Sequence, residues 1–305
     1  MTLTSTPFVS IIIPVFNDAK HLSLCLVSLE HQTYPKSFYE VIVVDNGSDS
    51  DENIQEIVDR SKSILISELT PGSYAARNKG ISAAQGEVIA FTDADCVPTP
   101  NWIEKGVGAL LNTPNCGLVA GRIEIFFKHS QPTPVELYES ITAFPQKQLL
   151  ERRHYAAAAN IFTFKAVLEK IGLFDATLKS NGDVEWGQRV FSHGYQQIYT
   201  NEACVYHPAR YSFQQLYKRT IRLAGGVYDL QNRRNPSSLK RNLVFLRELI
   251  LDFIPPLMFT FNAFRDPRLK GIRQKLEVSI VMFFVRYVTG WEKVRLKLGA
   301  VSARE

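Results

Sequence analysis

Short apolar runs alternate with longer amphipathic stretches along the first hundred residues. The apolar runs are rich in β-branched residues, which predicts strands at 8–16, 40–45, 63–66 and 88–92. The stretches between them carry apolar residues at helical spacing, which predicts helices that begin near residues 18, 52 and 74. Asn17 and Asp18 are expected to cap the first of these helices. Strands that alternate with helices form a parallel sheet with right-handed crossovers, so the pattern predicts an α/β protein.

The pattern continues less regularly to about residue 210. A helix at 102–111 and a strand at 117–125 are expected to extend the same body. Prolines interrupt 128–153, which predicts loops around one or two short helices, either as a mobile, acceptor-facing segment or as surface decoration. A strand at 161–164 leads into a helix that Gly172 is expected to end in a left-handed conformation.

Acidic residues follow two of the predicted strands. Asp45 ends one of them, and Asp93 and Asp95 end another, before Pro98 is expected to stop further regular pairing. Carboxyl ends of parallel strands meet at one sheet edge, where ligands of α/β proteins bind. Neighbouring carboxylates repel each other unless a cation lies between them, and oxygen ligands suit Mg²⁺ or Mn²⁺. The sequence leaves two interpretations, a metal site or a solvated turn at the end of a strand.

A third acid follows the turn at 180–182. Asp183 is expected near the N-terminus of a helix, where backbone N–H groups and the helix dipole favour an ionised carboxylate. The alternative is a helix cap with no further role. A catalytic interpretation therefore needs support from other residues.

Charge is distributed unevenly along the 305 residues. Residues 1–209 contain 16 Lys/Arg and 23 Asp/Glu, whereas residues 210–305 contain 19 and 7, so a basic tail follows a mildly acidic body. The four cysteines form no Cys-x-x-Cys pair and are expected to be reduced, buried thiols. We see neither a secretory signal nor a long apolar segment, which predicts a cytoplasmic protein without a membrane span.

The tail combines its positive charge with large apolar residues. The run 249–259 is apolar but interrupted by Asp252 and two prolines, and aromatic and aliphatic residues recur at helical spacing from Ile280 to Trp291. This pattern favours a segment that lies on the inner face of a membrane, among anionic lipids. A helix packed on the catalytic domain, or buried between subunits, is the alternative. Nucleic acid is not expected, because the large apolar blocks need burial.

Six motifs occur in order along residues 8–225. They are Val9–Asn17, Val44–Ser48, Arg77–Gly80, Asp93–Asp95, Ile171–Asp175 and Asp183–Trp186. Together they resemble family 2 of the inverting nucleotide-sugar glycosyltransferases. The resemblance implies a GT-A fold, which is a Rossmann-like, mostly parallel central sheet flanked by helices. We expect a catalytic domain at 1–235, with its nucleotide-sugar half at about 1–125 and its acceptor half at about 126–235. A helical, basic extension is expected at 236–305.

The resemblance also implies roles for individual acids. Asp45 would read the base of the donor nucleotide, most often uracil, and Asp93 would face the ribose. Asp95 would hold a divalent ion, Mn²⁺ or Mg²⁺, that bridges the diphosphate. Asp183 matches the position of the catalytic base. Many members have an acid immediately before that base, but this chain has Gly182 there.

Further residues complete the predicted site. Those on the donor side are Pro14, Phe16, Arg77 and Ala94, and those on the acceptor side are Asn160, Glu185 and Trp186. His207 is interpreted as a further metal ligand, with a core histidine at a strand end as the alternative. Arg219 and Arg222, three residues apart on a predicted helix, would add positive charge at the diphosphate or are surface arginines.

These residues predict one reaction. A base takes the proton of an acceptor hydroxyl that attacks the sugar opposite the leaving nucleoside diphosphate, which inverts the anomeric centre. The Gln-x-x-Arg-Trp signature of processive members is absent, so we expect transfer of one or a few hexoses to a glycan or lipid-linked acceptor, as in polysaccharide or cell-envelope glycan synthesis. The alternatives are a non-catalytic partner subunit, suggested by Gly182, and a nucleotidyltransferase.

Overall fold

The computed structural model describes residues 6–234 and 237–303. The chain divides into two compact units. The first comprises Met1–Glu124, Phe144–Ala176 and Gly182–His207, and the second comprises Ile125–Ala143, Thr177–Asn181 and Pro208–Glu305. The expected boundary near residue 235 stays a prediction.

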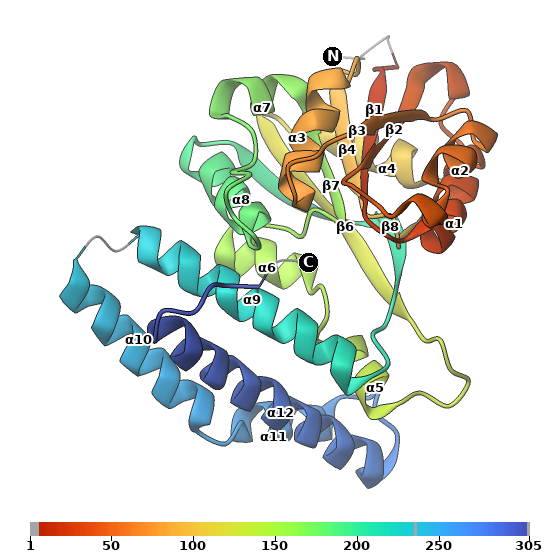
Figure 1. Ribbon diagram of the computed structural model, residues 1–305. Coiled ribbons are helices and arrows are strands. Elements are labelled where there is room, and N and C mark those ends of the chain that lie inside the picture. The colour runs from red at the N-terminus through yellow and green to blue at the C-terminus, as the bar shows by residue number, and fades with distance from the viewer. Residues whose placement is uncertain (1–5, 235–236, 304–305) are drawn as a thin grey trace. The chain divides into compact units, whose positions relative to one another are not determined.

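Four parallel strands form one half of the sheet in the first unit (Figure 1). They are β1 (Val9–Val15), β2 (Tyr39–Asp45), β3 (Ile64–Ser67) and β4 (Val88–Thr92), in the spatial order β3-β2-β1-β4. The helices α1 (Ala19–Glu30), α2 (Ile54–Arg60) and α3 (Ser73–Ala83) lie between these strands in the sequence. Two short 3-10 helices, Lys36–Phe38 and Ser50–Glu52, precede β2 and α2. The alternation predicted from the sequence is confirmed here.

The other half of the sheet contains antiparallel pairs, which the sequence pattern did not indicate. Its strands are β7 (Asn160–Phe164), β6 (Cys116–Phe126), β8 (Gln196–Pro208) and β5 (Val97–Pro98), and they follow β4 in that order. β7 runs antiparallel to both β4 and β6, and β5 runs antiparallel to β8. The expectation that Pro98 stops pairing was wrong. Pro98 pairs with Val205 in the last strand of the sheet, an edge position that tolerates proline.

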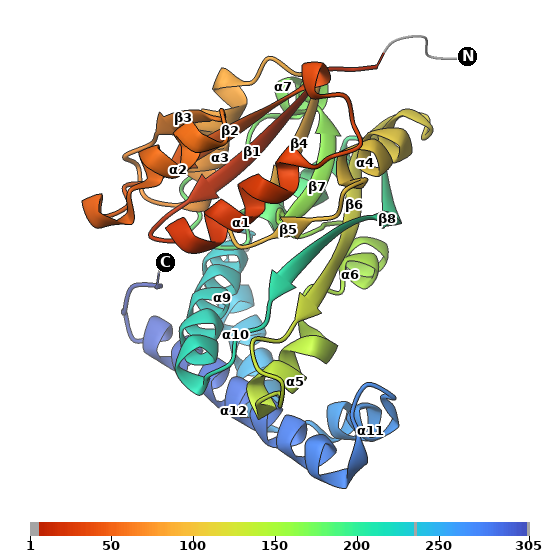
Figure 2. The ribbon, with the colours of Figure 1, turned by 90° about the vertical axis from the view of Figure 1, so that its right-hand side faces the viewer.

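Both faces of the sheet are covered by helices (Figure 2). Successive strand residues point to opposite faces, so Ile11 and Ile13 contribute to one core and Ile12 to the other. The first core also receives side chains from α1, α2 and α4 (Trp102–Leu111). The second receives them from α3, α7 (Lys165–Ile171) and α8 (Gly182–Ser192). This mixed α/β architecture with helices on both faces confirms the predicted fold class.

Two local predictions about helix ends need correction. Asp18 stands at the N-cap of α1, but its carboxylate bonds the His21 ring, and Glu52 accepts the hydrogen bond from the Ala19 N–H instead. Gly172 ends α7 with a φ of 90° and a ψ of 158°. This conformation has the expected positive φ but lies outside the left-handed helical region, and it too favours glycine.

The second unit is helical. Its elements are α5 (Pro134–Thr142), α9 (Phe213–Arg234), α10 (Ser238–Phe253), α11 (Leu257–Arg265) and α12 (Gly271–Lys297). The long α12 packs against each of the other four, around a core that includes Tyr138, Leu216 and Val281. The irregular stretch 128–153 therefore holds α5 and, in the first unit, α6 (Gln146–Arg153), as expected. Within the described residues, no helix has the length and apolarity needed to cross a bilayer.

Candidate active site

Asp45 lies at the end of β2, at the same sheet edge as the end of β4. In the register of the parallel strands, Val15 of β1 pairs with Asp45, and β1 also pairs in parallel with β4. The predicted co-location of Asp45 and Asp93 at one edge is thus confirmed. The Asp45 carboxylate accepts a hydrogen bond from the Ser48 N–H at 3.0 Å, which turns the chain sharply after the strand.

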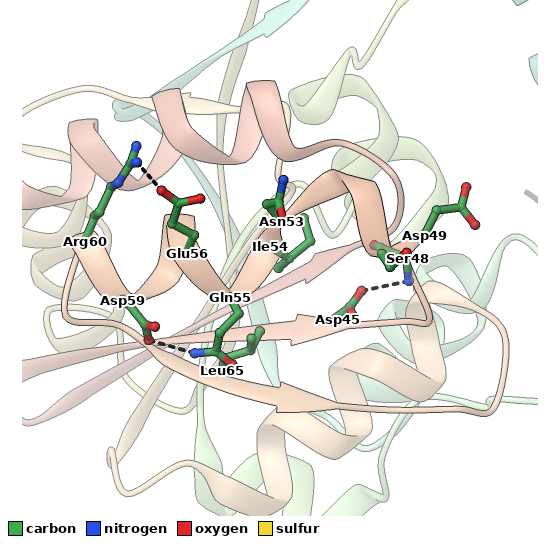
Figure 3. A pocket seen from close by; sticks show the side chains of 11 residues that line it. Asp45, Ser48, Asp49, Asn53, Ile54, Gln55, Glu56, Asp59, Arg60 and Leu65 are labelled. Atoms are coloured by element: carbon green, nitrogen blue, oxygen red, sulfur yellow. Dashed lines mark hydrogen bonds and ion pairs between the residues drawn. The ribbon is translucent and has the colours of Figure 1, made fainter.

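A cavity of about 770 Å³ opens beside Asp45 (Figure 3). Its lining includes the carboxyl groups of Asp45, Asp49, Glu56 and Asp59. Figure 3 shows that Glu56 is bonded to Arg60 and that Asp59 accepts a hydrogen bond from Gln55. This volume is typical of ligand sites. Its acidic lining suits neutral groups that donate hydrogen bonds better than it suits phosphate.

Two asparagines brace the loops around this edge, and the sequence singled out only Asn17, as a helix cap. Asn46 donates to the carbonyl groups of Glu68 and Thr70 and accepts from the Gly72 N–H at 2.6 Å. Asn17, with a φ of 49°, donates a hydrogen bond to the Asp49 carboxylate and accepts one from the Asp49 N–H. The Asn17 N–H donates to Ser48 at 2.9 Å. These bonds hold the loops after β1, β2 and β3 together.

Asp93 forms an ion pair with Arg77. Arg77 lies on α3, and its side chain is buried. The guanidinium donates to the Asp93 carboxylate and also to the Ser73 carbonyl oxygen, at 3.4 Å. The positive charge of Arg77 therefore offsets the negative charge of Asp93. This ion pair reduces the repulsion expected between Asp93 and Asp95.

Asp95 contacts His207, which lies one residue before the end of β8. The Asp95 Oδ2 and the His207 Nε2 are 3.2 Å apart, and the His207 ring is buried against Phe144. In octahedral coordination at about 2.1 Å, neighbouring ligand atoms lie about 3 Å apart. The pair therefore fits two adjacent ligand positions of Mg²⁺ or Mn²⁺. Among the described residues, no third His, Cys, Asp or Glu joins them in a metal-binding group.

The two cysteines nearest these acids remain protonated. Burial raises the pKa of Cys25 and of Cys96 well above the ordinary range, and the charges of Asp95 and Asp93 raise both further. A thiol acts as a nucleophile or a metal ligand through its thiolate form. All four cysteines are buried and unpaired, so they are structural thiols, as expected.

Asp183 occupies the first turn of α8, as the sequence predicted. Its Oδ1 accepts hydrogen bonds from the Val184 N–H at 3.0 Å and from the Tyr74 hydroxyl at 3.2 Å. Burial raises the pKa of Asp183 above its ordinary value, and the charge of Arg77 and the hydrogen bonds only partly oppose that shift. A half-buried carboxylate whose pKa is raised is a stronger base than an exposed aspartate.

Tyr74 contacts both Gly182 and Asp183, and sequence reasoning did not single it out. Its ring lies against Gly182, where an added Cβ would come within 2.8 Å of the ring carbons. The space that another residue at position 182 would need is therefore filled by Tyr74, whose hydroxyl also bonds the neighbouring Asp183. The glycine at position 182 thus has a packing reason. Only the fold brings residues 74 and 183 together.

The remaining predicted residues divide into exposed and buried positions. Phe16 is half exposed at the end of β1, Pro14 is partly buried, and Ala94 is buried between the two acids. Glu185 is paired with Arg189 at 2.9 Å.

Two of the predicted acceptor-side residues are fully buried. The Asn160 side chain bonds the Trp102 indole and the carbonyl groups of Arg122 and Ala203. The Trp186 indole donates to the Gly172 carbonyl oxygen. These side chains hold the core together, and their predicted contact with the acceptor stays a prediction.

Arg219 and Arg222 lie on α9 in the second unit. Arg219 faces Glu139 of α5, with the Nη1 3.7 Å from the Oε1, and Arg210 bonds the same buried carboxylate at 3.0 Å. Arg219 is therefore a paired arginine and not a surface one. The predicted contact of both residues with the diphosphate stays a prediction.

Comparison with known proteins identifies similar sequences. A family model described as "Glycosyl transferase family 2" matches residues 10–172. Glycosyltransferase AglE of Haloferax volcanii is 37% identical over 260 residues, which cover 83% of this chain and 84% of AglE. The pre-mycofactocin glycosyltransferase of Mycobacterium tuberculosis is 29% identical over 236 residues, which cover 74% of this chain and 48% of that protein.

A solved structure has a similar fold. Mannosyltransferase PcManGT from Pyrobaculum calidifontis, in complex with GDP-Man and Mn²⁺, superposes with a TM-score of 0.56. The similarity covers 98% of this chain and 77% of that one, at 18% sequence identity. At that identity the likeness concerns the fold.

Proposed function

Since this chain belongs to glycosyl transferase family 2 and is a glycosyltransferase that acts on nucleotide sugars, we propose that it is a metal-dependent, inverting and non-processive enzyme. The observation that carries this proposal is the environment of Asp183. Its carboxylate is half-buried, is held by Tyr74 and Val184, and has a raised pKa. These are the properties of a general base that works near neutral pH.

The proposed reaction is a single displacement. Asp183 accepts the proton of an acceptor hydroxyl while the hydroxyl oxygen forms a bond to the anomeric carbon. The bond from that carbon to the nucleoside diphosphate breaks, and the diphosphate leaves with the bonding electrons. Attack opposite the leaving group inverts the anomeric centre.

The donor is proposed to bind along the sheet edge. The acid-lined cavity beside Asp45 suits a neutral base and ribose, which donate hydrogen bonds to carboxylates. Asp95 and His207 are the proposed metal ligands, and their 3.2 Å separation supports that role. A bound divalent ion would offset the charge that develops on the leaving diphosphate. We favour a uridine nucleotide, and the GDP-mannose of PcManGT makes a guanosine nucleotide the comparison to test.

The acceptor is proposed to be a glycan or a lipid-linked glycan at the cytoplasmic face of a membrane. The support is the apolar and basic character of helices α10 to α12. Such an acceptor belongs to polysaccharide or envelope glycan synthesis. We propose no nucleic acid as a partner.

The test compares two variants in donor binding and in sugar transfer. Donor binding is measured as the rise in thermal stability with UDP- or GDP-sugars and Mn²⁺, because a ligand that binds the folded state stabilises it. Asp183→Asn should bind donor normally and lose transfer by at least about a hundredfold. Asp95→Ala should lose both transfer and the Mn²⁺-dependent stabilisation. Retained transfer by Asp183→Asn would exclude Asp183 as the base.

A further inference from the structure

Helices α10 and α12 turn large apolar side chains towards solvent. On α10 the exposed residues follow helical spacing, at Leu239, Leu243, Leu246 and Ile250. On α12 they recur at Ile272, Leu276, Ile280, Phe283, Tyr287 and Trp291. Single exposed leucines are ordinary in soluble proteins, but continuous apolar stripes mark a surface that contacts something else.

The two stripes meet. α10 packs against α12, as Figure 1 shows. The Phe253 ring, at the end of α10, lies 6.1 Å from the Tyr287 ring of α12, and the Trp291 ring follows at 6.4 Å. α11 packs on the same helix and adds exposed Leu257, Met258 and Phe261. We call the exposed apolar side chains of these three packed helices together the α10–α12 face.

Charged groups of the same helices point inward and fix this orientation. Lys293 of α12 is buried and lies 3.0 Å from Glu248 and 2.7 Å from Asp252, both on α10. Gln231 of α9 also bonds Glu248. Rotating α10 to bury its leucines would separate these carboxylates from Lys293 and leave that ammonium group buried without its partners, which is costly. The outward leucines are thus a fixed feature of the packing.

The charge of these helices selects among possible partners. Residues 238–297 contain twelve Lys/Arg and five Asp/Glu, a formal charge of +7. Each of the five acids forms an ion pair with a cation of the same segment, in the pairs Glu248–Lys293, Asp252–Lys293, Asp266–Arg268, Glu277–Arg273 and Glu292–Arg295. A second copy of the chain would bring the same positive charge to the interface. An anionic lipid surface complements both the charge and the apolar stripes.

We propose that the α10–α12 face docks on the interface of an anionic bilayer, with its leucines and aromatic rings at the level of the acyl boundary. The cationic side chains reach the headgroups along their own apolar stems, as the Arg265 guanidinium does over the Phe261 ring, 4.0 Å from its centroid. This inference rests on the proposed function, since it brings the enzyme to a lipid-linked acceptor.

The test is co-sedimentation of the full chain with vesicles. We expect binding to phosphatidylcholine vesicles that contain phosphatidylglycerol, and much weaker binding to phosphatidylcholine alone. The double variant Leu243→Gln/Ile280→Gln replaces side chains that are 59% and 63% exposed, so it should fold normally. Its partition coefficient for the anionic vesicles should fall at least about tenfold.

Two further variants separate the contributions. Leu24→Gln/Val27→Gln is the matched control, because these apolar side chains of α1 are 52% and 51% exposed on the first unit. It should bind vesicles like the unsubstituted protein. Lys240→Gln/Arg247→Gln removes two exposed cations and should weaken binding to anionic vesicles about tenfold while making it less dependent on salt.

Three results would overturn the proposal. In the first, the unsubstituted protein does not bind anionic vesicles, and in the second, Leu243→Gln/Ile280→Gln binds them as well as the unsubstituted protein does. In the third result, the unsubstituted protein is a dimer that binds no vesicles, and Leu243→Gln/Ile280→Gln converts that dimer to a monomer. Donor-induced thermal stabilisation is measured on the same proteins without lipid. If donor-induced stabilisation is absent while vesicle binding follows the predicted pattern, the proposed function fails and the docking surface stands. If donor-induced stabilisation is present and the vesicle results fail, the docking surface fails and the proposed function stands.

Discussion

Burial and the neighbouring groups affect the proton affinity of the Asp183 carboxyl in opposite directions. Burial disfavours the ionised form, whereas the Tyr74 hydroxyl, the Val184 N–H and the Arg77 charge favour it, and burial has the larger effect. The folded state therefore binds this proton more tightly than the unfolded chain. Stability contributed by the protonated form is lost as the pH rises through the folded-state pKa. The raised pKa of Asp183 thus lowers the stability of the folded protein at neutral pH.

Replacing Tyr74 with phenylalanine should change the pH dependence of transfer. The variant loses a hydrogen bond to the ionised carboxylate, which raises the pKa of Asp183 further. If Asp183 is the base, as we propose, it must be ionised, and the acid limb of kcat/KM should move to higher pH by about one pH unit. At a pH above the Asp183 pKa of both the variant and the unsubstituted enzyme, the two rates should be similar.

Tyr39→Phe is the control for this experiment. Tyr39 also donates one hydrogen bond, to the Leu29 carbonyl oxygen at 2.8 Å, and it lies at the opposite end of β2 from Asp45. Its loss should leave the pH profile unchanged. An unshifted acid limb in Tyr74→Phe would show that Tyr74 does not tune the base.

At the level of elements, one close contact on α9 supports the loop that precedes Asp183. A Cβ at Gly226 would lie 2.6 Å from the Ser180 Cβ and 2.6 Å from the Asn181 Nδ2. The loop Thr177–Asn181 also takes a hydrogen bond from Arg233 to Thr177 at 2.9 Å, and Lys179 donates to the Ser302 carbonyl oxygen at 2.7 Å. The chain continues directly from this loop into Gly182 and Asp183. Packing on α9 therefore constrains the residues that directly precede Gly182 in the sequence.

Gly226→Ala should displace this loop. Overpacking of this kind lowers the free energy of unfolding by about 1–3 kcal/mol, and kcat should fall because Asp183 follows the displaced residues. Gly108→Ala is the matched control, because Gly108 is also helical but has no atom within 4 Å of the added Cβ. It should keep full activity and gain up to about 1 kcal/mol from helix propensity. Thermal unfolding and initial rates measure both effects, and unchanged rates in Gly226→Ala would contradict this reasoning.

At the scale of the whole molecule, each unit has its own hydrophobic core. The cores on the two sheet faces belong to the first unit, and the core around α12 belongs to the second. Side chains that stabilise one unit should therefore be separable in experiment from those of the other. Lys293, which joins α10 to α12, offers such a test.

Lys293→Met leaves Glu248 and Asp252 as neighbouring carboxylates without their cation. Loss of one partner of a buried ion pair costs on the order of 3 kcal/mol. Hydrogen exchange should accelerate in α10 and α12 and stay unchanged in β1 and β4. Lys105→Met breaks the more exposed pair Lys105–Glu202 and should change stability by less than about 0.5 kcal/mol. Equal effects of the two variants would argue against the burial of the Lys293 cluster.

The sequence by itself determined the parallel half of the sheet and the acids at its edge. The reason is local, because β-branched runs specify strands, and parallel strands place Asp45, Asp93 and Asp95 at one edge. It likewise placed Asp183 in the first turn of a helix. Six ordered motifs then indicated the family, and the comparisons with known proteins confirm it.

Only the tertiary structure decided which side chains meet across the chain. Tyr74 with Asp183, His207 with Asp95 and Lys293 with two carboxylates are contacts between residues far apart in sequence, and no local pattern encodes them. The antiparallel strands and the burial of Asn160 and Trp186 were missed for the same reason. Hydrophobic periodicity reports which face of an element is apolar. It does not report which neighbour covers that face, nor that α10 and α12 would expose theirs.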